Sequence, residues 1–173
     1  MRARDLVAEY PTVTLDSNAL DAARLVAAQR QPEALVLDAN GEPYAVLPAS
    51  CLVDLPPVGR ATDGPGSDAA IDEPYVGRLH RSLAVRTVRD CLRREKTVPS
   101  VADPDDSILE IAALMARDRS RLVAVIEYPK GRPVSGAGPR LLGVITDFRL
   151  LEQLLGRPRT SDAIGWSSPA PPN

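Results

Sequence analysis

The residues with the clearest capacity for chemistry lie in the stretch LLGVITDFRLL, from Leu141 to Leu151. An apolar strand is expected to end there at Thr146, where an amphipathic helix begins. A corner of this kind exposes backbone N–H groups, which are a common binding site for anions. The Thr146 hydroxyl can either cap the helix or bind a ligand. The corner is therefore a ligand site or a structural turn, and its residue types must decide between the two.

Arg149 determines which ligand this corner would accept. An acid in the first turn of the helix would be favoured by the helix dipole and would accept hydrogen bonds from ligand hydroxyl groups. Arg149 only donates, so it favours a phosphate or another anion, or else it is a solvated or ion-paired helix residue. Asp147 lies about 200° away around the helix, which favours a first-turn charge over a displaced ligand contact.

The corner belongs to the second copy of an internal repeat. DSNALDAARLVAAQRQPEALVLD, from Asp16, aligns with DDSILEIAALMARDRSRLVAVIE, from Asp105, and PYAVLP, from Pro43, aligns with the strand around Gly143. Each copy therefore predicts the order strand, helix, strand, strand, helix. Copy one carries Pro48 and Cys51 where copy two carries Thr146 and Arg149, so its corner lacks the hydroxyl.

The first long helix of each copy shows a start signal and an apolar face. Capping residues are expected near Asp16 to Asn18 and near Asp105 to Ser107. The predicted buried faces comprise Leu20, Ala23, Val26 and Ala27 in copy one, and Ile108, Ile111, Ala112 and Met115 in copy two. One copy alone would leave an apolar face of its sheet exposed, so we expect the two copies to cover one another with pseudo-twofold symmetry.

Composition gives the boundaries of these units. Copy one with its lead-in helix, RARDLVAEY, is predicted to cover residues 2–55, and copy two with its lead-in, TVRDCLRRE, residues 85–156. The segment between them, residues 56–84, is a Pro-, Gly- and Asp-rich linker with a helix expected from about Glu73 to Leu83. The tail, residues 157–173, is predicted to be disordered.

Bulk composition argues against several classes of function. The net charge of −2 and an aromatic content of 3% argue against a nucleic-acid partner. No apolar run approaches the roughly 18 residues of a membrane helix, and the N-terminus lacks a secretory signal, so we expect a cytoplasmic protein without a membrane partner. A single histidine and the lack of a triad, paired-carboxylate or metal signature argue against an enzyme, a metal site and a required cofactor.

The repeated order, the lead-ins RDL and VRDCL, and the segments SRLVAVIE and LLGVITDFRLL resemble the tandem CBS-domain family, also called Bateman modules. The resemblance covers residues 2–155 and implies an α/β (α+β) fold of two β-α-β-β-α motifs, a regulatory role and a homodimer. Clefts in this family often bind AMP, ATP or S-adenosylmethionine, and the Thr and Asp of its T-x-x-D pattern contact ribose. The nucleotide cleft implied for this chain comprises Ser100, Val101, Arg121, Leu122, Val123, Thr146, Asp147 and Arg149.

Two functions stay open from the sequence. The first is a stand-alone sensor of an adenosine-containing or other anionic metabolite that signals to a separate, unidentified protein. The second is a ligand-free scaffold or dimerisation module, which the missing acids in both copies favour. Phe148, Leu151 and Leu155 form an apolar stripe that favours a homodimer. If a nucleotide binds, the sequence predicts that Arg149 makes AMP and ATP bind more tightly than adenosine.

Overall fold

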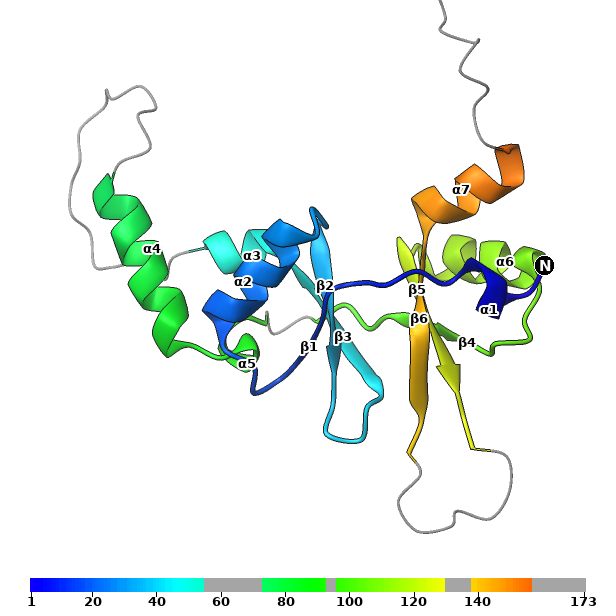
Figure 1. The fold of residues 1–173 in the computed structure, drawn as a ribbon, viewed down its shortest axis with the longest axis horizontal. Coiled ribbons are helices and arrows are strands. Elements are labelled where there is room, and N and C mark those ends of the chain that lie inside the picture. Colours follow the sequence, from blue (N-terminus) through cyan, green and yellow to red (C-terminus); the bar gives the residue numbers. More distant parts are fainter. Residues whose placement is uncertain (55–72, 93–95, 130–137, 157–173) are drawn as a thin grey trace, which may run out of the picture.

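The computed structural model describes residues 1–54, 73–92, 96–129 and 138–156. Two three-stranded mixed sheets face each other at the centre, and the helices lie outside them (Figure 1). In each sheet the first strand runs parallel to the second and the second antiparallel to the third. The strands are β1 (Thr12–Thr14), β2 (Glu33–Leu37) and β3 (Pro43–Pro48), then β4 (Ser100–Ala102), β5 (Leu122–Glu127) and β6 (Arg140–Thr146). The predicted α/β fold of two β-α-β-β-α copies is confirmed.

The first long helix of each copy, α2 (Ala19–Ala28) or α6 (Ile108–Asp118), begins directly after the predicted capping region. In copy one the side chain of Asn18 accepts hydrogen bonds from the first turn of α2. In copy two Ser107 and Glu110 cap one another reciprocally at the start of α6. These caps satisfy backbone N–H groups that have no partner within the helix, and they set the rotation of each helix over its sheet.

The buried helix faces were predicted correctly for α6 and only in part for α2. Ile111 and Met115 of α6 are buried, and Ile108 and Ala112 pack beside them. In α2, Val26 is buried as expected, but Ala27 is exposed, so its assignment to the core is wrong. Because the helix starts after Asn18, the positions that face the core are Ala19, Ala22 and Val26.

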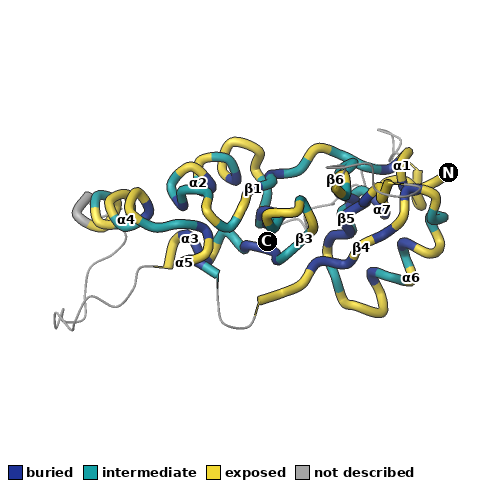
Figure 2. The backbone as a smooth tube through the Cα atoms, turned by 90° about the horizontal axis from the view of Figure 1, so that it is seen from below, coloured by how far each residue is buried: buried dark blue, intermediate teal, exposed yellow. Residues whose placement is uncertain are grey.

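A shared core joins the two sheets. Each copy contributes apolar side chains from the sheet face that its own helices leave uncovered, and Figure 2 shows the resulting buried centre. The cluster consists of Leu35, Val46, Leu122, Ala124, Ile126 and Val144. Burial of these side chains removes from water the apolar face that either copy alone would expose. The expected mutual covering of the two copies is therefore confirmed.

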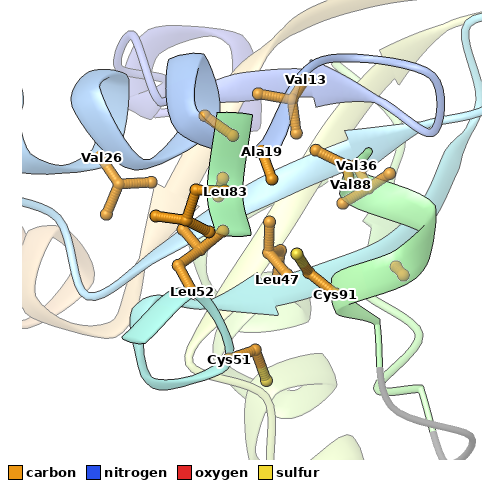
Figure 3. Close-up of a cluster of buried hydrophobic side chains, with 13 residues drawn as sticks. Val13, Ala19, Val26, Val36, Leu47, Cys51, Leu52, Leu83, Val88 and Cys91 are labelled. Carbon is orange, nitrogen blue, oxygen red and sulfur yellow. The ribbon is translucent and has the colours of Figure 1, made fainter. Parts of the chain in front are cut away.

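The two lead-in helices are exchanged between the copies. Helix α1 (Ala3–Leu6) precedes copy one in the sequence but packs on copy two, and α5 (Val88–Cys91) precedes copy two but packs on copy one (Figure 1). Figure 3 shows Val88 and Cys91 among the core side chains of copy one. Two pairs of isolated bridges repeat the exchange symmetrically, namely Arg2–Ser107 with Asn18–Thr87, and Ala8–Val144 with Val46–Thr97.

The remaining helices are α3 (Ala49–Val53), α4 (Glu73–Val85) and α7 (Asp147–Leu155). Helix α4 confirms the predicted linker helix, and its Leu83 packs into the core of copy one (Figure 3). The disorder predicted for residues 157–173 concerns a segment outside the described residues. Within the described part of the chain, no helix is both long and apolar enough to cross a membrane.

Candidate ligand-binding site

A pocket of about 230 Å³ lies between the two copies, at the corner where β6 meets α7. Copy two contributes the start of α7 and the residue before β5. Copy one contributes the turn that leads into β2, and the segment after α1 adds one aromatic side chain. The lining residues are Tyr10, Gln31, Pro32, Glu33, Arg121, Thr146, Asp147 and Phe148.

The start of α7 is capped by its own residues. Thr146 Oγ1 accepts a hydrogen bond from the Arg149 N–H over 3.2 Å, which confirms the capping role considered for this hydroxyl. The Phe148 N–H donates to Asp147 Oδ1 over 2.7 Å, and the Asp147 N–H donates to the Arg121 carbonyl over 2.8 Å. The backbone donors that an anion would use at this corner therefore already have partners.

Three charged side chains line the pocket. Arg121 lies near Asp147, with 3.7 Å between Nε and Oδ2. Glu33 is half-buried, and burial is the main cause that raises the pKa of its carboxyl group. Arg121 opposes that rise in pKa, and Asp147 adds to it. With both carboxyl groups ionised, the pocket carries two negative charges and one positive charge.

Burial also raises the pKa of the Tyr10 phenol, and Glu33 adds to the effect. The phenol therefore stays protonated across the physiological pH range, where its hydroxyl group can both donate and accept a hydrogen bond. Tyr10 and Phe148 are the two aromatic residues of a pocket whose lining also includes the carboxylates of Glu33 and Asp147. This combination suits a ligand that has a flat apolar ring and several hydrogen-bond donors.

The pocket includes three of the eight residues expected from the sequence, namely Arg121, Thr146 and Asp147. Arg149 does not line it. The guanidinium of Arg149 is half-buried, and its Nε donates to the Leu6 carbonyl over 3.0 Å. Since Leu6 is the last residue of α1, Arg149 fastens the exchanged lead-in helix to copy two. Asp147 lines the pocket instead, as its position about 200° around the helix from Arg149 would allow.

The other four expected residues lie elsewhere in copy two. Leu122 and Val123 are buried within β5. Ser100 is buried in β4, where its Oγ donates to Asp118 Oδ2 over 2.9 Å. Val101 is exposed on the same strand. None of these four residues lines the pocket beside Thr146.

Sequence reasoning missed the copy-one side of the pocket. In the repeat alignment that pairs Asp16 with Asp105, Pro32 corresponds to Arg121, a predicted site residue. Glu33 corresponds to Leu122, a second predicted residue. The alignment could therefore have pointed to the lining residues Pro32 and Glu33.

The corner of copy one holds a separate cavity of about 150 Å³. It lies beside Cys51, at the position that Arg149 occupies in copy two. Lys96 also lines this cavity, and its ammonium lies 3.4 Å from the centre of the Tyr44 ring. The remaining lining residues are Val46, Pro48, Ser50, Leu92 and Thr97.

Comparison with known proteins agrees with this architecture. Residues 88–156 match the family model of the CBS domain. The comparison with curated proteins gave no match.

Two similar solved structures contain nucleotides, and their low identity supports a common fold alone. The CBS domain of a bacterial CNNM/CorC family Mg²⁺ transporter in complex with ATP has 15% identity and a TM-score of 0.57, over 90% of this chain and 88% of that one. CBSX2 in complex with AMP has 17% identity and a TM-score of 0.54, over 89% and 96% of the two chains.

A third structure is more similar in sequence. It is a CBS domain-containing protein of unknown function from Kribbella flavida, with 33% identity and a TM-score of 0.70. The alignment covers 89% of this chain and 99% of that protein. Identity at this level over nearly the whole relative goes beyond a shared fold, and both copies of the repeat take part in it. This protein therefore belongs to the CBS-domain family.

Proposed function

We propose that this protein is a stand-alone regulatory CBS-pair module, which binds an adenosine-containing metabolite in the pocket between its copies. One observation carries the proposal: two aromatic rings and two carboxylates converge on one pocket at the Thr146 corner. A purine can pack against the rings of Tyr10 and Phe148. The Asp147 and Glu33 carboxylates can accept hydrogen bonds from a ribose diol. The nucleotides in two proteins of the same fold give further support.

The pocket also suggests how binding could be transmitted. Tyr10 belongs to the segment that leads from α1 on copy two to β1 on copy one. A ligand that contacts Tyr10, Pro32 and Thr146 would therefore touch both copies and this connecting segment. Such a ligand would favour the arrangement in which all three are docked. We infer that the output acts on a separate protein, whose identity the pocket does not indicate.

Calorimetric titration with adenosine, AMP and ATP tests the proposed binding. Phe148→Ala removes one aromatic wall, and we expect it to weaken adenosine binding by about tenfold. Leu155→Ala is a matched control, because Leu155 is exposed on the same helix and does not line the pocket. Ligand at 100 times Kd should also raise the free energy of unfolding by about 2.7 kcal/mol. If none of the three compounds binds the wild-type protein, the sensor proposal is wrong.

The alternative is a ligand-free scaffold or dimerisation module. One observation favours it: the pocket volume of about 230 Å³ falls below the roughly 300–1,000 Å³ of most small-molecule sites. The apolar stripe of α7 is also exposed, with 69% of Phe148, 52% of Leu151 and 82% of Leu155 accessible to solvent. We propose that this stripe joins two copies of the chain as a homodimer.

Light scattering distinguishes the proposed homodimer from a monomer. A homodimer gives a particle of twice the 18.5 kDa chain mass, and Leu151→Glu should shift it to the monomer because a buried unpaired charge opposes association. Glu152→Gln is the control, since it changes a neighbouring exposed residue of α7 without adding a charge. A monomeric wild-type protein at micromolar concentration would contradict the dimer. A non-catalytic role and a cytoplasmic location stay predictions from the sequence.

A further inference from the structure

The start of α7 offers a phosphate few free donors. The first N–H groups of α7 donate to the Arg121 carbonyl, Asp147 Oδ1 and Thr146 Oγ1. An anion could accept a hydrogen bond from one of these N–H groups only if the bond to its present acceptor in the protein were broken. The backbone N–H groups with which a helix N-terminus usually binds phosphate are therefore largely paired within the protein itself.

The two arginines near the corner are also engaged. Arg149 donates to the Leu6 carbonyl from outside the pocket lining. Arg121 lines the pocket, but it already lies 3.7 Å from Asp147 and near Glu33. A phosphate beside Arg121 would have to share its positive charge with two carboxylates and would be repelled by both.

Acceptors, by contrast, are available. Among the described residues, no side chain donates a hydrogen bond to the Glu33 carboxylate or forms an ion pair with it. The carboxylate is half-buried, so water does not fully replace such a partner. Asp147 Oδ1 accepts a hydrogen bond from the Phe148 N–H, and Oδ2 lies 3.7 Å from Arg121 Nε. Each carboxylate oxygen has two lone pairs, so each can accept one more hydrogen bond from a ligand.

We propose that this pocket selects its ligand for hydrogen-bond donors and positive charge, and that it takes a neutral or cationic adenosyl compound in preference to a nucleotide phosphate. The inference rests on the proposed function, because it assigns a ligand class to the same site. A ribose diol supplies donors for the carboxylates, and a sulfonium or ammonium centre neutralises the excess negative charge. This preference is the opposite of the one predicted from Arg149 in the sequence.

Two matched pairs of probes isolate the two effects in calorimetric titrations. S-adenosylmethionine and S-adenosylhomocysteine differ by one methyl group and the positive charge on sulfur. We expect the charged compound to bind about fivefold more tightly, the ratio given by one partly screened ion pair. Adenosine and AMP differ by one phosphate, and we expect adenosine to bind at least as tightly as AMP.

Variants link the preference to the pocket. Glu33→Gln and Asp147→Asn each remove one negative charge, and each should bring the ratio between S-adenosylmethionine and S-adenosylhomocysteine close to one. Glu42→Gln is the control, because Glu42 is an exposed acid on the β2–β3 hairpin outside the pocket lining. It should leave the ratio unchanged. The two variants lie in different copies, so misfolding of one would not remove the test.

The outcomes distinguish this inference from the proposed function. If AMP binds more tightly than adenosine, or if the two sulfur compounds bind equally, the charge preference is wrong and the binding function stands. A preference that survives both Glu33→Gln and Asp147→Asn would place the cation elsewhere and overturn the inference. If none of the four probes binds, the proposed function fails together with the inference.

Discussion

The two strand-to-helix corners share a backbone path and differ in what one side chain does. In copy two, Arg149 extends from α7 to the Leu6 carbonyl and fills the space beside the exchanged lead-in helix. In copy one, the shorter Cys51 stands at that position, and a cavity of about 150 Å³ remains. Arg149, which the sequence suggested as a ligand contact, therefore anchors α1 to copy two. The comparison teaches that departure from a family pattern can strengthen packing within the chain.

The lead-in segments also pair differently with the strands that precede the two corners. Ala8 exchanges two hydrogen bonds with Val144, over 3.0 and 3.1 Å, whereas the equivalent Thr97 accepts one from Val46 over 2.9 Å. Gly143 leaves room for this pairing, since a Cβ atom there would lie 2.8 Å from the Ala8 carbonyl oxygen. The equivalent residue in copy one is Ala45. The lead-in of copy one is thus held by more contacts than the lead-in of copy two.

The largest expected effect concerns the lead-in helices themselves. Leu6 is fully buried against copy two, and Leu6→Ala should lower the free energy of unfolding by about 2–5 kcal/mol. Cys91 is its counterpart at the end of α5, and Cys91→Ala should cost only about 1 kcal/mol because less apolar volume is removed. Chemical denaturation measures both effects. Equal losses for the two variants would contradict the difference between the lead-ins.

Hydrogen exchange locates the effect of Leu6→Ala. The Val144 amide donates to the Ala8 carbonyl, so its protection reports the docking of the lead-in on β6. We expect Leu6→Ala to reduce protection at Val144 more than at Val36, which lies in the core of copy one. Uniform loss of protection across both copies would mean that the lead-in has no local effect.

The next prediction concerns the close contact at Gly143. Gly143→Ala places a methyl group against the Ala8 carbonyl and the Val7 side chain, so it should lower stability by about 1–3 kcal/mol. Gly77→Ala is the control, because nothing lies within 4 Å of a Cβ at Gly77 in α4. It should raise stability by about 0.5–1 kcal/mol through helix propensity. Denaturation curves that show no loss for Gly143→Ala would mean that the lead-in can shift away without cost.

Sequence periodicity predicted most of the fold because the signals were local. Asn18 and Ser107 indicated the starts of two helices. The apolar strands of each copy predicted a second sheet, because one copy alone would leave an apolar sheet face exposed. The exchange of α1 and α5 could not be predicted from these signals, because a four-residue helix has the same pattern whichever copy covers it. Ala27 was assigned to the wrong face because a run of apolar residues, ARLVAA, leaves the rotation of the helix open.

The site was harder to predict than the fold. Thr146 and Asp147 were identified because they lie where a strand meets a helix, and Arg121 because its segment, SRLVAVIE, resembles the family pattern. Tyr10 and Glu33 enter the pocket only through the packing of one copy on the other. The contact of Arg149 could not be predicted because its hydrogen-bond partner, the Leu6 carbonyl, lies 143 residues away in the sequence. Every residue has a backbone carbonyl, so residue type and spacing do not indicate which distant carbonyl a side chain will contact.

A substitution at Arg149 separates fastening from ligand binding. Arg149→Met keeps much of the aliphatic volume and removes the hydrogen bond to Leu6, so we expect a loss of about 1 kcal/mol in stability. Because Arg149 does not line the pocket, adenosine and AMP affinities should change by less than about twofold. Denaturation and calorimetry measure the two effects. A clear loss of AMP affinity with unchanged stability would restore the phosphate role predicted from the sequence.

The smallest effect concerns pH and the pocket carboxylates. Burial raises the pKa of Glu33 in the folded protein, so folding costs more once this group is ionised. The penalty is absent below the unfolded pKa and develops as the pH rises through the folded pKa. Glu33→Gln removes it and should stabilise the unliganded protein at pH 7 by less than about 1 kcal/mol, because water reaches half of this carboxyl group. Denaturation of both proteins between pH 4 and pH 7 should show a difference that grows with pH. A variant that is less stable than the wild type at pH 7 would mean that Glu33 has a favourable partner in the folded protein. Its carboxylate would then not be free to bind a cationic ligand.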